Sequence, residues 1–256
     1  MRILFALFFV STSVLAIASM PRYEEAGVVV FENPADVSNS FVYFLIVLAF
    51  TAFVLLSVRF KRILTLILQF ITVLAIYYVL SPFIGVLAIL IALLIILILE
   101  FKPNMLIINV AAIMLAAGIT SIFGISLEPI PAIVLLVILA VYDAIAVYKT
   151  KHMINLAESV KDLKVPMLFV APKNAYMGVG DAVIPNILAV SAQRFTKSQV
   201  FLFLKVSALL TLVGGLIGLL ILLYIVERKG GAHPGLPFVN TGAIIGFLVS
   251  STISHV

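Results

Sequence analysis

The chain has 256 residues, of which 64% are hydrophobic and 11% charged, and its mean hydropathy is +1.31. Soluble proteins have about 45–50% apolar and about 25% charged residues, so this composition excludes a soluble domain and indicates a membrane protein. The net charge of +5 is therefore not the footprint of a nucleic-acid-binding protein, and the lack of cysteine excludes disulfide and thiol chemistry.

Apolar runs recur along almost the whole chain, separated by short charged segments. A membrane-spanning helix needs about 20 mostly apolar residues, with a range of about 17–25. By this measure the sequence predicts an all-α polytopic membrane protein with nine transmembrane helices. Their expected ranges are 3–20, 38–58, 62–80, 83–99, 104–123, 130–148, 178–193, 200–226 and 236–254.

The first predicted span also has features of a signal peptide. Arg2 precedes an apolar stretch, and Ala16-Ile17-Ala18 is a candidate cleavage site. Cleavage would leave eight spans and would not change the orientation of the later ones. We expect the segment to be retained as the first of the nine helices.

Basic residues are distributed unevenly between the two sets of alternating loops. One set carries 12 of the 16 lysines and arginines, and the other carries only Arg22, Arg194, Lys197 and Lys205. Because cytoplasmic loops carry an excess of basic residues, the first set is predicted to be cytoplasmic. The N-terminus is then inside and the C-terminus outside.

The order of the predicted spans divides the chain into three parts. Residues 1–148 form a six-helix part, 149–177 a cytoplasmic loop, and 178–256 a three-helix part. Within the loop, residues 166–172 (PMLFVAP) are too short to span a membrane and too apolar for an ordinary loop. They indicate a short strand or membrane-edge segment, or else a tether packed on neighbouring helices.

Two aspartates cannot be placed in a loop, namely Asp143 late in the sixth span and Asp181 at the start of the seventh. These spans run in opposite directions, so both carboxylates are predicted at a similar depth toward the cytoplasmic side. An ionisable group at bilayer depth costs roughly 2.5–3.5 kcal/mol on insertion scales, which makes such a residue a functional candidate. The alternative is a structural role, in which Asp181 caps the seventh helix.

Two close carboxylates cannot both ionise cheaply, so one of them keeps its proton. Such a pair suits peptide hydrolysis, because the ionised group takes a proton from water while the other donates to the scissile carbonyl. Neither a metal nor another cofactor is indicated, since the three histidines lie outside the apolar spans and show no ligand spacing.

The residues before Asp181 suggest how a substrate approaches it. Gly178 and Gly180 lack side chains, so a peptide backbone or a facing helix can come close to the carboxylate. Pro185 follows within the same short span, and we expect it to interrupt the helix where protein or water can satisfy the freed carbonyl.

Three motifs in this order resemble those of presenilin and signal peptide peptidase, the GxGD intramembrane aspartyl proteases. They are Tyr142-Asp143, Gly178-Val179-Gly180-Asp181 and Pro234-Gly235-Leu236-Pro237. The resemblance covers essentially the whole chain and is closest to a prokaryotic, archaeal-type presenilin homologue. The family's last motif has alanine where this chain has Gly235.

The resemblance implies a presenilin-like fold and assigns roles to individual residues. Asp143 and Asp181 are implied to be the catalytic pair, and Tyr142 the aromatic neighbour of the first. The residues implied to shape the active site and substrate entry are Pro234, Gly235 and Leu236. The predicted orientation is that of presenilins, which implies transmembrane-helix substrates with their N-terminus outside, in a prokaryotic cytoplasmic membrane.

The chemistry also suggests a role for the apolar segment in the loop. Cleavage of a helix requires local unwinding, and an unwound backbone in lipid needs replacement hydrogen-bond partners. We expect residues 167–171 to supply them by pairing with the substrate just past the cut, as a related strand is implied to do in presenilins.

Two other function classes stay open on the sequence. A proton- or sodium-coupled transporter would also use paired membrane carboxylates, although the chain has no inverted repeat. A membrane scaffold would use both aspartates structurally. Prepilin-type peptidases share a GxGD aspartate, but the PGLP segment fits them less well. No nucleic-acid partner is expected, and the oligomeric state is left open.

Overall fold

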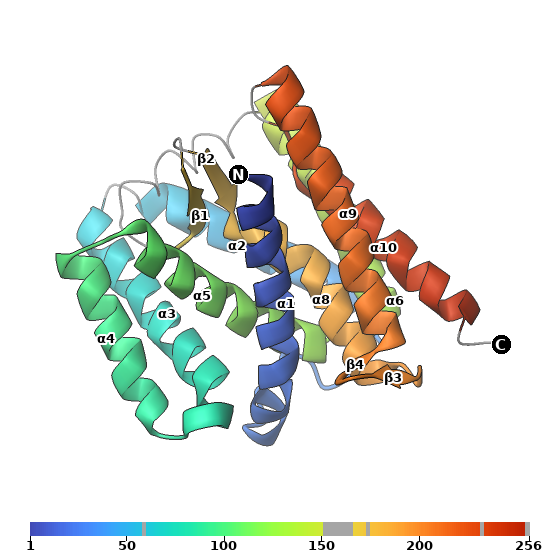
Figure 1. The fold of residues 1–256 in the computed structure, drawn as a ribbon, viewed down its shortest axis with the longest axis horizontal. Helices are drawn as coiled ribbons and strands as arrows, with labels where there is room; N and C mark the ends of the chain where they lie inside the picture. The colour runs from blue at the N-terminus through green and yellow to red at the C-terminus, as the bar shows by residue number, and fades with distance from the viewer. Residues whose placement is uncertain (58–59, 151–165, 173–174, 231–232, 254–256) are drawn as a thin grey trace.

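The computed structural model describes residues 1–57, 60–150, 166–172, 175–230 and 233–253, and within them the chain forms nine α-helices (Figure 1). Their bounds are α1 Arg2–Glu25, α2 Ser38–Ser57, α3 Lys61–Ile84, α4 Leu87–Phe101, α5 Met105–Ile125, α6 Pro129–Ile145, α8 Val179–Phe195, α9 Val206–Lys229 and α10 Leu236–Ile253. Each predicted span corresponds to one helix, although α3 continues to Ile84, two residues into the range predicted for the next span. The predicted nine-helix fold is confirmed.

Among the described residues, seven helical segments are long and apolar enough to cross a membrane, when α6 is counted with the turn that follows it as Pro129–Lys149. The two helices outside this set, α4 and α8, have 15 and 17 residues. The prediction was wrong at the start of the eighth span. Residues 200–205 form a small hairpin of strands β3 (Val200–Phe201) and β4 (Leu204–Lys205). This hairpin is apolar, with Leu202 83% exposed, which is why hydropathy alone joined it to α9.

The seventh predicted span also differs from its expectation. α8 runs without a break from Val179 to Phe195, with Pro185 buried inside it. A proline has no N–H to donate to the carbonyl four residues earlier, and here that residue is Asp181. Pro185 therefore releases a carbonyl at Asp181 while the helix continues, and it does not break the helix.

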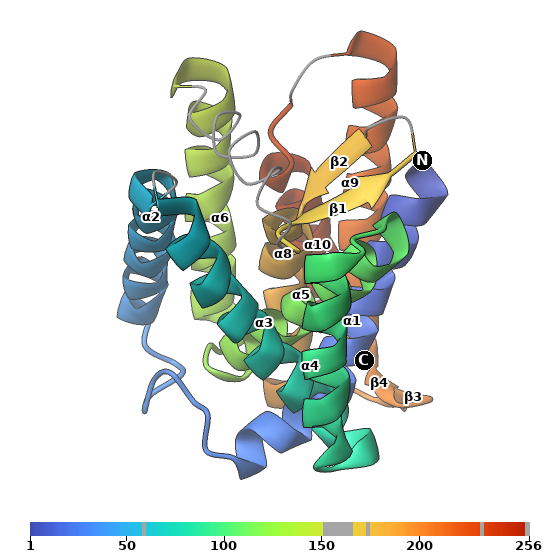
Figure 2. The same cartoon turned by 90° about the vertical axis from the view of Figure 1, so that its left-hand side faces the viewer.

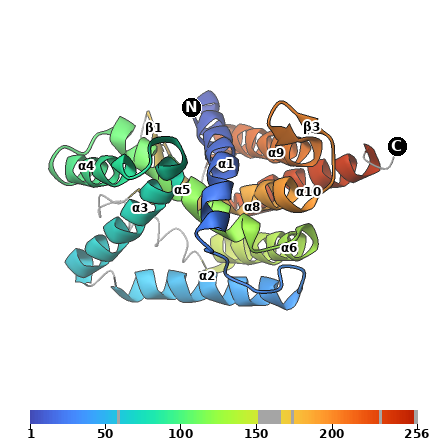
Figure 3. The same cartoon turned by 90° about the horizontal axis from the view of Figure 1, so that it is seen from below.

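Helices α1, α5 and α8 lie together at the centre of the molecule (Figures 1 and 3). Seen from below, α3 and α4 lie to one side, α9 and α10 to the other, and α2 runs along a third side beside α6. The peripheral α4 buries its small residues Ala88 and Ala92, whereas five of its six leucines are exposed. This is expected in lipid, where small residues allow close helix contact and large apolar ones gain little from burial.

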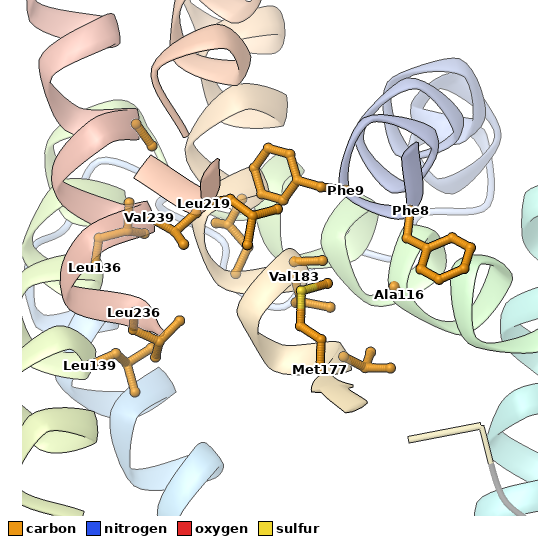
Figure 4. Close-up of a cluster of buried hydrophobic side chains, with 14 of the residues drawn as sticks. Phe8, Phe9, Ala116, Leu136, Leu139, Met177, Val183, Leu219, Leu236 and Val239 are labelled. Atoms are coloured by element: carbon orange, nitrogen blue, oxygen red, sulfur yellow. The ribbon is translucent and has the colours of Figure 1, made fainter. Parts of the chain in front are cut away.

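A cluster of buried apolar side chains joins α1, α6, α8, α9 and α10 (Figure 4). Phe9, Val183, Leu219 and Val239 meet within it, each at most 4% exposed. Figure 4 shows Leu236 of α10 beside Leu139 of α6 at the edge of this cluster. The helices that carry the two aspartates, α6 and α8, therefore share one core with α10.

Short strands cover one end of the helices (Figure 2). β1 (Leu168–Ala171) pairs antiparallel with β2 (Ala175–Gly178), with Phe169 opposite Met177. β1 lies within residues 166–172, for which a strand was one of the predicted alternatives, whereas β2 was not predicted. The N-terminus lies at the same end as β1 and β2, and the β3–β4 hairpin lies at the opposite end (Figure 1).

The backbones of α9 and α10 touch through glycines. A Cβ atom added to Gly218 would lie 2.3 Å from the carbonyl oxygen of Phe238, and one added to Gly242 would lie 2.2 Å from that of Gly214. Such small residues let two membrane helices approach backbone to backbone. This contact fixes the position of α10, whose first residue is Leu236.

We predict that Gly218→Leu separates α9 from α10 and lowers the free energy of unfolding by about 1–3 kcal/mol, the usual cost of overpacking. Thermal unfolding in detergent micelles measures the effect. Ile217→Leu, on an exposed position of the same helix, is the matched control and should leave the unfolding temperature unchanged. Equal unfolding temperatures for Gly218→Leu and wild type would show that the close approach is not needed.

Candidate active site

Asp143 lies near the end of α6 and is 5% exposed. Its Oδ2 accepts a hydrogen bond of 3.0 Å from the backbone N–H of Leu236. Two residues after Asp143 the α-helix ends, and the chain continues as a π-helical turn, η2 (Ala146–Thr150). Such turns inside or beside α-helices often occur at functional sites. Hydropathy cannot distinguish this turn from the α-helix predicted to residue 148.

Asp181 lies in the first turn of α8, three residues after the N-cap Gly178. The structural alternative, in which Asp181 caps this helix, is therefore wrong, because the N-cap is Gly178. The carboxylate still lies at the positive end of the helix dipole. A Cβ on Gly178 would lie 3.4 Å from Asp181 Oδ2, which is ordinary contact.

Gly235 lies directly against the carboxylate of Asp181. A Cβ atom at Gly235 would lie 2.8 Å from Oδ1 of Asp181 and 2.9 Å from its Cγ, closer than real Cβ contacts. The Asp181 carboxylate thus rests against the backbone of Gly235, while Asp143 binds the N–H of the next residue. The structure brings the two aspartates together on adjacent residues of one segment.

This segment, Pro234-Gly235-Leu236, is buried at all three residues. The carbonyl of Gly235 accepts hydrogen bonds of 3.2 Å from the N–H groups of Phe238 and Val239 and so begins α10. An irregular segment is tolerated at membrane depth only where protein or water satisfies its polar groups. Here α10 satisfies one side of the segment and Asp143 the other.

Asn240, one turn into α10, fastens that helix to the helix of Asp143. Its Nδ2 donates a 2.8 Å hydrogen bond to the carbonyl of Leu136 on α6, and the side chain is 1% exposed. This residue was not among those predicted from the sequence. Its signal is an amide inside the apolar run from Leu236 to Ile245, where a polar group is costly without a partner.

The other motif residues lie around this centre in different ways. Tyr142 packs edge-on against Phe44 of α2, with 5.7 Å between ring centroids. Gly180 is exposed, and a Cβ there would meet nothing within 4 Å. Gly180 directly precedes Asp181 in the chain, so the space beside Gly180 is where a substrate backbone was predicted to approach the carboxylate.

His233 connects the motif segment to the end of the Asp143 helix. Its Nδ1 lies 3.3 Å from the hydroxyl of Tyr148 in η2, and its Nε2 lies 3.0 Å from the carbonyl of Gly230. Among the residues that the structure describes, no group of three His, Cys, Asp or Glu side chains is arranged to hold a metal ion.

Comparisons with known proteins agree with this architecture. A family model described as "Signal-peptide peptidase, presenilin aspartyl protease" matches residues 5–176 and 173–256. A solved structure of a presenilin family intramembrane aspartate protease in space group C222 matches with a TM-score of 0.77 and 33% identity, over 97% of this chain and 97% of that one. A second such structure, in space group P2, has a TM-score of 0.75 and 34% identity, over 97% and 96% of the two chains.

No curated protein sequence matches the chain. The family match covers nearly all of it, and both solved relatives are aligned along almost their full length. The chain therefore belongs to the signal-peptide peptidase and presenilin family, and it is an integral membrane protein and an intramembrane aspartic endopeptidase.

Proposed function

We propose that the protein hydrolyses peptide bonds within transmembrane helices and that Asp143 and Asp181 are its general acid and base. The observation that carries this proposal is the convergence of both carboxylates on Gly235 and Leu236. Ion-coupled transport also needs membrane carboxylates, but the family of the chain does not favour it.

In the proposed reaction, the ionised carboxylate of the pair takes a proton from a water molecule as its oxygen attacks the scissile carbonyl carbon. The protonated partner donates its proton to the carbonyl oxygen. When the tetrahedral intermediate collapses, one of its hydroxyls gives its proton to the ionised member of the pair as the C=O bond re-forms. The C–N bond breaks, and the leaving nitrogen takes a proton from the other member. One carboxylate and one carboxylic acid remain, so the pair is ready for another cycle.

The residues around the two aspartates position them and leave room for the substrate. Pro234 and Leu236 hold the segment between the two aspartates, and the open space at Gly180 admits a substrate backbone beside Asp181. Tyr142 supports α6 against α2 through Phe44. We assign these residues positioning roles around the two reacting carboxylates.

The β1–β2 hairpin is the proposed docking site for the unwound substrate, but through a different strand from the one expected. Residues 167–171 were the expected partner. In the structure β1 pairs with β2 on one side, and on its other side both backbone groups of Val170 bind the Asn109 side chain. We therefore propose that the substrate lies along β2, which leads directly into α8 and Asp181.

The basic residues support an orientation with the N-terminus and the β1–β2 hairpin on the cytoplasmic side of a prokaryotic cytoplasmic membrane. Substrates would then enter with their N-terminus outside. A peptide of one span reconstituted in each orientation tests this, because only the predicted orientation should be cleaved.

We predict that Asp143→Asn and Asp181→Asn each lower kcat for a single-span peptide by at least about 10²–10⁴-fold, the range contributed by general acid–base catalysis. Mass spectrometry of products in detergent measures the loss, and thermal unfolding checks that each variant is folded. Residual cleavage at the wild-type rate in either folded variant contradicts the assignment.

We predict that Gly235→Ala lowers kcat by about tenfold or more, although alanine is the family's residue at this position. The new methyl group would lie 2.8 Å from Oδ1 of Asp181 and displaces the carboxylate from its present position. A misplacement of 1 Å costs about 10²-fold in rate. Because the carboxylate is the free end of a side chain, the unfolding temperature should not change. Wild-type turnover by the variant would show that the contact with Gly235 does not determine the position of the Asp181 carboxylate.

We predict that a substrate peptide carrying a photo-crosslinking residue just past the cut joins to residues 175–178. Asp181→Asn protein, which binds without cleaving, is used to hold the complex. Mapping of the crosslinked peptide by mass spectrometry gives the strand directly. Crosslinks concentrated in 167–171 instead would return the docking role to β1.

A further inference from the structure

Asn109 places a side-chain amide in the second turn of α5, within an otherwise apolar segment. The residue is 5% exposed, so its amide needs protein partners. We propose that Asn109 is a positioning residue, which latches the β1–β2 hairpin to α5 by hydrogen bonds. It thereby determines which peptide bond of the substrate reaches the two aspartates. This inference rests on the proposed protease function and adds a determinant of cleavage position.

The two hydrogen bonds of this latch reproduce strand pairing. Asn109 Nδ2 donates to the carbonyl oxygen of Val170 over 2.8 Å, and the N–H of Val170 donates to Asn109 Oδ1 over 2.7 Å. A residue of a neighbouring antiparallel strand makes the same two bonds when it lies directly opposite. The amide thus takes the place of a third strand at Val170, and it holds β1 through one donated and one accepted hydrogen bond.

The hairpin passes this restraint directly to Asp181. β1 and β2 are in register from Leu168 opposite Gly178 to Ala171 opposite Ala175, and the N–H of Val179 donates to the carbonyl of Met167 over 3.2 Å. Val179 is the first residue of α8 and lies two positions before Asp181. A shift of β1 along α5 would therefore move the strand that leads into the catalytic helix.

Apolar packing alone does not supply this restraint. Phe169 of β1 is fully buried and stacks on Phe8 of α1, with ring centroids 5.2 Å apart and planes at 21°. Such contact holds the hairpin down but is non-directional, whereas hydrogen bonds require a defined distance and angle. A two-stranded hairpin is only marginally stable by itself. Asn109 therefore defines where along α5 the hairpin lies.

The test uses two substitutions with different hydrogen-bonding capacity. Asn109→Leu keeps the approximate size of the side chain and removes both bonds. Asn109→Asp keeps the shape, and when protonated it can still donate one bond and accept the other; when ionised it repels the Val170 carbonyl. Ser191→Ala is the matched control, because it removes a buried 2.7 Å bond to the Leu127 carbonyl from the other end of α8.

Hydrogen exchange at Val170, which does not depend on activity, is measured first. We expect exchange at least about tenfold faster in Asn109→Leu and unchanged in Ser191→Ala. Mapping of the products of a single-span peptide follows. Asn109→Leu should lower kcat/KM at least about tenfold and spread the cuts over neighbouring bonds, while Ser191→Ala keeps the wild-type cuts.

The Asn109→Asp variant distinguishes positioning from folding. Its kcat/KM relative to wild type should approach one at low pH, where the carboxyl is protonated, and should fall as the pH rises. A ratio that does not vary with pH, or wild-type cuts at the wild-type rate by folded Asn109→Leu, overturns the proposal. If Asn109→Leu does not fold, the pH dependence of kcat/KM for Asn109→Asp relative to wild type tests the proposal. If wild type itself cuts no peptide, the protease function fails, while exchange at Val170 still tests the latch.

Discussion

The hydrogen bond from the Leu236 N–H to Asp143 is the interaction on which the site depends. A carboxylate inside a membrane protein and an irregular backbone segment are each costly when unsatisfied. In this protein each satisfies the other, because the N–H that begins α10 is bound by the buried acid of α6. Gly235 then lets Asp181 come against the same segment. One short stretch of backbone therefore brings together two acids that lie 38 positions apart in the chain.

Buried asparagines extend the same principle to the elements around the site. Asn240 joins α10 to α6, Asn109 joins β1 to α5, and Asn186 of α8 donates a 3.3 Å bond to the carbonyl of Phe9 on α1. In lipid the packing of apolar surfaces gives little preference for one arrangement over another, because the lipid tails are equally apolar. Directional amide bonds between elements supply that preference where a reaction needs defined geometry.

The helices could be predicted because a bilayer requires long apolar segments, and the two aspartates because a charge there is costly. The structural features that were missed leave weaker signals. β2 is only four residues long (AYMG), too short to show a pattern of its own, and β3–β4 is apolar enough to resemble a helix. Pro185 was expected to break α8, but a proline in a membrane helix can be accommodated when neighbouring helices pack around it. The latch of Asn109 depends on Val170, 61 positions away, which no local pattern reveals.

The most direct test of the central claim is the binding of a single-span peptide whose scissile bond is replaced by a hydroxyl-bearing tetrahedral carbon. A matched peptide without the hydroxyl is the reference, and calorimetry in detergent gives both dissociation constants. If Asp143 and Asp181 act on one tetrahedral centre, wild type should bind the hydroxyl peptide at least about 10²-fold more tightly than the reference. Loss of either carboxyl should remove that preference. An equal preference in wild type and in both Asp→Asn variants would contradict the account.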